Sequence, residues 1–217
     1  MATVLQFKSS ASLDKLTGRK ADTLKALLHL IKTCSGSSIF YHTFSAFLKL
    51  REAQVPYNSD FAIWVYRSLN EIALAERMMA IDFSEYSTVE DLRNRLIKIM
   101  EEYEKQRPTA FQKMGDEPFY LYDVQRFVYL TDKFAYDLKS FREILPTISV
   151  YSLYYHFIES RLETKLRNDD FSTWIEEDLG LHDLATRIRR IDINVYNLEG
   201  LRSRIMSLID EHLADHR

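Results

Sequence analysis

The sequence predicts an all-α protein built from two tandem five-helix repeats that pack about a pseudo-twofold axis. Three observations predict this fold: turn-forming residues are scarce, apolar residues recur with helical spacing, and the chain repeats itself. The 217 residues include only 5 glycines and 4 prolines, so most of the chain must belong to long regular elements. Short extended arms could precede each repeat.

The internal repeat is clearest where the segment 58–86 returns, without a gap, as the segment 168–196. Eleven of the 29 aligned positions are identical, whereas ordinary residue frequencies would give about two matches. Upstream, residues 135–162 align with residues 21–48 at a shift of 114 positions. A helical module has therefore been duplicated, and we expect the two copies to bury their apolar faces together.

The first helices of each copy follow from the spacing of apolar residues. Leucine and isoleucine at steps of three and four predict a helix over 19–33, and a wide apolar face predicts another over 38–51. Asn58 and Asp60 mark the start of a third helix, because short acceptor side chains cap helix N-termini and an acid suits the positive helix end.

The later helices are predicted in the same way. Asn70 precedes a fourth helix, and Ser87 with Glu90 has the spacing of a capping box before a long fifth helix. The second half repeats these signals. Residues before each copy look extended, at 2–8 and at 119–122, and the two arms could pair as a short ribbon.

The predicted domain boundaries follow from the repeat. Prolines, a glycine and mixed charges without helical period fall between the halves. We therefore expect repeat 1 over 1–107, a linker over 108–118 and repeat 2 over 119–217, with the repeats packed as one compact unit.

Composition excludes several classes of function. The net charge of −3 and the 46% of hydrophobic residues are typical of a soluble globular protein and not of a nucleic-acid binder. There is no run of 18 apolar residues that could span a membrane. The single cysteine, Cys34, cannot form an internal disulfide, so we expect a cytoplasmic protein. Its counterpart in repeat 2 is Ile148, which favours an apolar filler over a nucleophile.

Four sequence blocks resemble an uncharacterised family of bacteria and archaea, a domain of unknown function. The blocks are TGRKA at 17–21, SSIFYH at 37–42, NSDFAIW at 58–64 and LAERMMAID at 74–82. The resemblance covers nearly the whole chain, although the second copy departs from it with TDKFA at 131–135 and LATR at 184–187. It implies a helical fold and offers no catalytic residue.

Two histidines at equivalent positions are the strongest candidates for chemistry. His42 and His156 each follow a tyrosine on the second helix of their repeat. If that helix packs near the start of the third, His42 meets Asp60 and His156 meets Asp170. Such a pair could orient an imidazole as a base or help to bind a metal. The alternative, which recurrence in both copies favours, is a histidine that holds two elements in register.

Two arginines give a second candidate. Arg77 precedes Asp82, and Arg187 precedes Asp192, near the end of one helix and in the turn after it. An arginine–aspartate fork would tie down that turn, and an anion clamp is the alternative.

These observations favour a non-catalytic helical accessory or protein-interaction protein that binds an unknown protein partner, with no nucleic acid, membrane, metal or cofactor. The alternative is a small-ligand, anion or metal-binding protein, or an enzyme, with a polar site where the repeats join. The residues that would line that site are His42, His156, Asp60, Asp170, Arg77 and Arg187.

Overall fold

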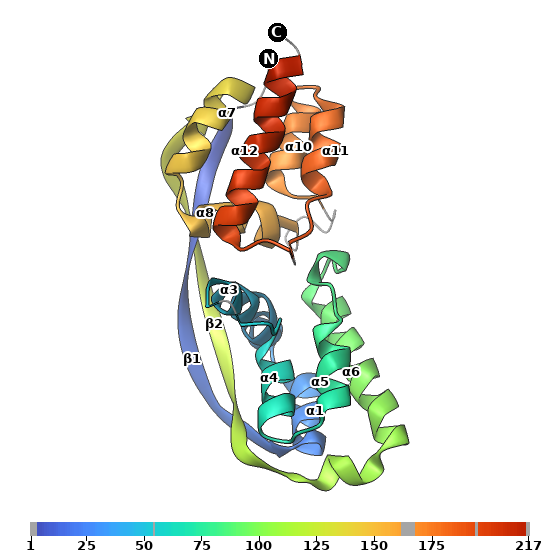
Figure 1. The fold of residues 1–217 in the computed structure, drawn as a ribbon. Helices are drawn as coiled ribbons and strands as arrows, with labels where there is room; N and C mark the ends of the chain where they lie inside the picture. Colours follow the sequence, from blue (N-terminus) through green and yellow to red (C-terminus); the bar gives the residue numbers. More distant parts are fainter. Residues whose placement is uncertain (1–3, 54, 162–167, 194, 216–217) are drawn as a thin grey trace. The chain divides into compact units, whose positions relative to one another are not determined.

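The protein is not purely helical, because a long two-stranded sheet accompanies its helices. A computed structural model describes residues 4–53, 55–161, 168–193 and 195–215. Strand β1 covers Leu5–Thr23 and strand β2 covers Met114–Ala135. The two strands pair with each other over most of their length (Figure 1). The prediction of an all-α fold was therefore wrong.

The sheet is an antiparallel ribbon. Thr17 donates a hydrogen bond to the carbonyl oxygen of Leu121, and Thr131 donates one to that of Phe7. Residues with higher numbers in β1 therefore pair with residues with lower numbers in β2, so the two strands run in opposite directions. At 19 and 22 residues the strands far exceed the usual 3–10 residues. Of the arms expected at 2–8 and 119–122, residues 5–8 belong to β1 and residues 119–122 to β2, whereas residues 2 and 3 lie outside the described residues. The expected linker contains a 3₁₀ helix, Pro108–Gln112, and the start of β2.

The first half of the chain continues from β1 into helices. Thr23 caps the first helix by accepting a hydrogen bond from the backbone amide of Ala26. The caps expected at Asn58 and Ser87 lie one residue further on, at Ser59 and Thr88. The helices are α1 (Leu24–Thr33), α2 (Gly36–Phe40), a π-helical turn (Tyr41–Ser45), α3 (Ala46–Glu52), α4 (Asp60–Arg67), α5 (Ile72–Met79), a 3₁₀ turn (Phe83–Glu85) and α6 (Val89–Gln106).

The second half follows a similar order of helices after β2. Asp137 opens it with a capping box that includes Ser140. The helices are α7 (Leu138–Ile144), a 3₁₀ turn (Leu145–Thr147), α8 (Val150–Tyr154), a π-helical turn (Tyr155–Glu159), α10 (Asp170–Glu177), α11 (His182–Arg189) and α12 (Leu198–Asp215). The π-helical turns fall at equivalent positions of the two halves and contain His42 and His156.

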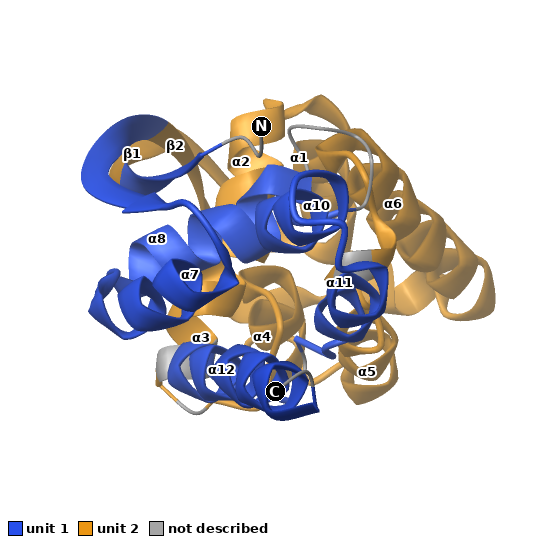
Figure 2. Cartoon of the chain, turned by 90° about the horizontal axis from the view of Figure 1, so that it is seen from above, with its two compact units in different colours: residues 1–11, 126–217 blue, residues 12–125 orange. Residues whose placement is uncertain are grey.

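The chain forms two compact units whose boundaries fall within the ribbon (Figure 2). Unit 1 contains residues 1–11 and 126–217, and unit 2 contains residues 12–125. Each unit therefore takes part of its ribbon from the strand that precedes the other half. The expected repeat boundaries, 1–107 and 119–217, describe the duplicated sequence and remain a prediction.

Aromatic side chains from the strands fill the core of each unit. In unit 1, Phe7 of β1 is fully buried, with its ring centroid 6.0 Å from those of Phe141 and Phe171. In unit 2, Phe119 of β2 lies 5.3 Å from Phe61 and 5.9 Å from Trp64. The strands thus contribute to both hydrophobic cores. Burial of these rings favours packing of the strands against the helices.

Candidate functional site

Each predicted histidine pairs with its predicted aspartate. Nδ1 of His42 lies 2.8 Å from Oδ2 of Asp60 in unit 2, and Nδ1 of His156 lies 2.7 Å from Oδ2 of Asp170 in unit 1. Both imidazoles are almost fully buried. The aspartates occupy the first turns of α4 and α10, where the positive helix end stabilises a carboxylate.

The second nitrogen of each ring contacts the ribbon. The backbone amide of Tyr122 in β2 donates to Nε2 of His42 at 2.9 Å, and that of Lys8 in β1 donates to Nε2 of His156 at 2.7 Å. An imidazole that accepts at Nε2 and donates from Nδ1 to a carboxylate is a neutral tautomer. Both nitrogens are therefore used, which leaves neither for a substrate proton or a metal ion in this arrangement.

The asparagine expected to cap the third helix ties down a different helix end. The side-chain amide of Asn58 donates to the carbonyl oxygens of Met78, Met79 and Ile81, at 3.1–3.3 Å. These carbonyls lie at or just beyond the C-terminus of α5, where carbonyl groups lack partners within the helix; that of Met78 also accepts a hydrogen bond from the backbone amide of Ile81. The N-cap itself is Ser59, and in unit 1 it is Asp169.

The expected arginine–aspartate forks do not form. The guanidinium of Arg77 donates to Gln106 at 2.9 Å, and that of Arg187 donates to Glu211. Both partners lie near the end of the long helix that follows, α6 or α12. Arg77 and Arg187 thus connect α5 or α11 to the long helix that follows it.

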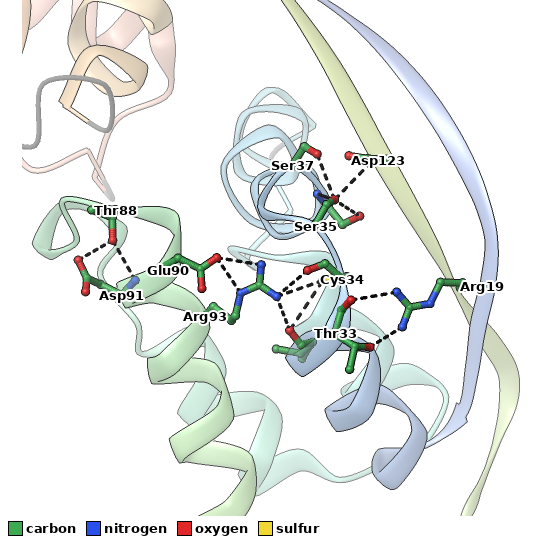
Figure 3. Close-up of polar contacts among 12 residues, drawn as sticks. Arg19, Thr33, Cys34, Ser35, Ser37, Thr88, Glu90, Asp91, Arg93 and Asp123 are labelled. Atoms are coloured by element: carbon green, nitrogen blue, oxygen red, sulfur yellow. Dashed lines mark hydrogen bonds and ion pairs between the residues drawn. The ribbon is translucent and has the colours of Figure 1, made fainter.

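Two buried arginines, which the sequence reasoning missed, anchor the end of the first helix in each unit. Nη1 of Arg93 donates to the carbonyl oxygens of Ile31 and Cys34, both at 2.8 Å (Figure 3). Arg202 contacts Leu145 and Ile148 in the same way, at 2.5 and 2.9 Å. A glutamate three residues before each arginine, Glu90 or Glu199, is the sequence signal that could have revealed them.

The lone cysteine lies beside the Arg93 anchor. Cys34 is buried, and its Sγ lies 3.8 Å from Nη1 of Arg93. Burial nevertheless raises the pKa of the thiol, and the nearby guanidinium only partly offsets this effect. The thiolate is the nucleophilic form of cysteine, so a raised pKa disfavours reactivity at Cys34.

Metal and membrane features can be assessed for the described part of the chain. There, no three side chains among histidine, cysteine, aspartate and glutamate gather closely enough to hold a metal ion. None of the described helices has the length and apolar character needed to cross a bilayer.

The six predicted site residues divide between the units. His42, Asp60 and Arg77 belong to unit 2, whereas His156, Asp170 and Arg187 belong to unit 1. Within a unit, the histidine–aspartate pair and the arginine have separate partners. Arg187 lines a cavity together with Arg190, Tyr196 and Arg204.

Comparison with known proteins finds a similar solved structure and a matching family. The structure of OrfY from Thermoproteus tenax matches with a TM-score of 0.82 and 28% sequence identity, over 96% of this chain and 95% of that one. No curated protein matches. A model of a family of unknown function, DUF5752, matches residues 3–210, which is nearly the whole chain. The protein therefore belongs to the DUF5752 family.

Proposed function

We propose that the protein is a non-catalytic interaction protein that binds an extended segment of a partner protein along β2. The observation that carries this proposal is an exposed apolar run, Phe127–Leu130. Its four side chains are 49%, 44%, 52% and 62% exposed in chain order. Because successive side chains of a strand point to opposite faces, two large hydrophobic side chains are exposed on each face of the ribbon.

The open edges of the ribbon support this mode of binding. Among the described residues the sheet has two strands, so each strand has one edge without a neighbouring described strand. Natural proteins usually protect such edges with charges, proline or short strands, because an apolar edge invites association. The run Phe127–Leu130 contains neither charge nor proline. A partner strand that paired with β2 would cover the apolar side chains.

The environment of the reactive residue types supports a non-catalytic role. Both nitrogens of His42 and of His156 have structural partners, and burial raises the pKa of Cys34. A cytoplasmic location and a prokaryotic distribution form part of the proposal. They rest on the single cysteine and on the sequence blocks described above.

A site-specific photo-crosslinker tests the proposal. The photoreactive residue benzoylphenylalanine replaces Tyr129 of the run in cells that produce the protein naturally. Tyr151 on α8 is the matched control, since it is also a tyrosine of unit 1 and is 55% exposed, compared with 52% for Tyr129. We expect a discrete adduct with another protein at position 129 and none at position 151. The Val128→Lys variant should abolish that adduct.

The other outcomes are equally informative. An adduct only between two copies of the chain would show that β2 pairs with itself and would overturn the proposal of a distinct partner. Equal labelling at positions 129 and 151, or none at either, would also overturn it. We expect Val128→Lys to keep the fold, because this exposed side chain contributes little to the core. Circular dichroism checks this expectation.

A further inference from the structure

Helices α11 and α12 and the turn between them line a pocket in unit 1. Its volume is about 380 Å³, within the range of roughly 300–1,000 Å³ that small-molecule sites occupy. Three arginines line it: Arg187 from α11, Arg190 from the C-cap of α11 and Arg204 from α12. Figure 2 shows both helices within unit 1.

The pocket carries an excess of positive charge. Three arginines and one aspartate, Asp192, line it, which gives a formal charge of +3 − 1 = +2. Glu211 lies beside them and contacts Arg187, while its other oxygen lies 3.5 Å from Nη1 of Arg204. Counting Glu211 as well leaves +1. A hydrogen bond from Ser207 and then the contact with Arg187 lower the pKa of Glu211, so the carboxylate stays ionised and positions both arginines.

Arg190 differs from the other two arginines of the pocket. Within the part of the chain that the structure describes, no hydrogen bond or ion pair involves the guanidinium of Arg190. Arginine presents a planar set of donors that matches the oxygens of phosphate and carboxylate groups. An anion bound in this pocket would therefore complete the coordination of Arg190 without breaking an existing ion pair.

The rest of the lining is apolar or aromatic. Ile191, Val195 and Leu208 contribute aliphatic surface, and Tyr196 contributes a ring. An inorganic anion gains no binding energy from an apolar surface, whereas an organic ligand gains energy by burying its carbon skeleton there. The pocket thus combines a cationic group of side chains with an apolar wall, which is how sites for charged organic molecules are generally built.

The first repeat provides a natural comparison. At the repeat shifts of 110 and 109, Arg187 corresponds to Arg77 and Arg204 to Arg95, but Arg190 corresponds to Ala80. The guanidinium of Arg77 is directed to Gln106 and lies over the ring of Tyr103. The cluster of three arginines is therefore confined to unit 1, whereas residues that serve the fold, such as the two histidines, recur in both units.

We propose that this pocket binds a small phosphate monoester, with Arg187, Arg190 and Arg204 around the phosphate and the apolar wall against the organic group. A phosphate monoester carries a charge of about −1.5 to −2 at pH 7 and has three free oxygens. It therefore matches three guanidinium groups better than a carboxylate, which has two oxygens and one charge. This binding site is independent of partner binding at β2.

Calorimetry with defined probes tests the proposal. The probes are phenyl phosphate, inorganic phosphate and benzoate, each titrated into the full-length protein at low ionic strength. We expect phenyl phosphate to bind most tightly, because it alone offers both the phosphate and an apolar ring. Added salt should weaken the binding, since the site is partly exposed.

Two matched variants locate the site. Arg190→Ala, which gives unit 1 the residue of unit 2, should weaken binding of phenyl phosphate about tenfold or more, the usual effect of losing a charge-assisted hydrogen bond. Arg77→Ala, at the corresponding position of unit 2, should change the affinity less than about twofold. Because Arg190 is exposed and its guanidinium has no partner among the described residues, its variant should melt at the same temperature as the parent.

Other results would overturn the proposal. They are the absence of phenyl phosphate binding at millimolar concentration, equal affinity for benzoate, or an Arg190→Ala variant that binds as the parent does. A phosphotyrosine peptide that binds at least about tenfold tighter than phenyl phosphate would assign the pocket to a protein ligand instead.

Discussion

Nε2 of His156 accepts a 2.7 Å hydrogen bond from the backbone amide of Lys8, a residue 148 positions earlier in the chain. The same relationship joins His42 to Tyr122. In each unit a buried imidazole thus connects the ribbon to the N-terminus of α4 or α10. The two contacts are equivalent under the repeat, since 8 + 114 = 122 and 42 + 114 = 156. One contact binds β1 to the helices of the second half, and the other binds β2 to the helices of the first half.

Replacing either histidine should therefore destabilise the fold. We expect His156→Ala to lower the free energy of unfolding by about 2–4 kcal/mol, because it leaves a cavity and removes the acceptor of a buried backbone amide. His42→Ala should have a similar effect. Urea denaturation followed by circular dichroism measures both. His182→Ala is the control, since that side chain is 77% exposed. A loss below about 1 kcal/mol in the His156 variant would show that the contact does not hold the strand.

The histidine–aspartate pairing could be predicted from sequence because both residues lie on helices that are close together in the chain. His42 lies on a helix with a clear apolar face, and Asp60 lies at a recognisable helix start, so packing of neighbouring helices brings them together. The acceptor role of Nε2 could not be predicted in this way. It depends on a strand 80 residues further on in the case of His42.

The ribbon itself escaped prediction for a related reason. The middle of β1 has the sequence SSASLDKLTGRK, in which apolar and polar residues do not alternate. Alternation arises when one face of a strand is buried, and much of this part of the ribbon is exposed on both faces. Its strand conformation comes from pairing with β2, which is remote in sequence. The aromatic and β-branched residues of β2, such as Phe127 and Val128, were the available signal.

The Arg93 and Arg202 anchors should be essential to stability. We expect Arg93→Met to cost about 2–4 kcal/mol, because it removes the arginine donor from two buried carbonyl oxygens. That of Ile31 then keeps only the weak Sγ–H donor of Cys34. Thermal and urea denaturation provide the measurement. Glu90→Gln serves as the control: Glu90 is 63% exposed, so its ion pair with Arg93 should contribute less than about 1 kcal/mol. Equal effects of the two substitutions would mean that the ion pair, and not the carbonyl contacts, is the important interaction.

The Asp137 cap should make stability depend on acid pH. A hydrogen bond from the backbone amide of Ser140 lowers the pKa of Asp137 below its ordinary value of 3.8. A group whose pKa is lower in the folded state stabilises the fold above its unfolded pKa and loses that effect as pH falls through the folded value. Asp137→Ala should therefore cost about 1 kcal/mol at neutral pH, and the difference from the parent should shrink below pH 3.8.

The control for this prediction is Asp137→Ser, which keeps a capping oxygen but has no charge to titrate. Its stability relative to the parent should improve as the pH falls, whereas the difference between the serine and alanine variants should stay constant. Urea denaturation at a series of pH values gives all three curves. A penalty for Asp137→Ala that is the same at every pH would contradict the assigned role of the carboxylate.

A final prediction concerns a buried carboxylate that is present only in the first repeat. The hydroxyl group of Tyr103 donates to Glu71 at 2.6 Å, and Nη1 of Arg107 lies 3.4 Å from the same carboxylate oxygen. Glu71 is buried, so Tyr103→Phe should cost about 1.5–3 kcal/mol by removing a hydrogen bond to a charged group. The second repeat has Leu181 and His212 at these positions, so this pair is not required by the shared fold.

The double variant Tyr103→Phe with Glu71→Leu tests that interpretation. If the cost of Tyr103→Phe comes from leaving Glu71 incompletely paired, adding the leucine of the second repeat should recover at least half of it, because no buried charge then remains. The two substitutions would be strongly non-additive in a double-mutant cycle followed by urea denaturation. Additive losses would instead mean that the hydroxyl group of Tyr103 stabilises the core through contacts other than Glu71.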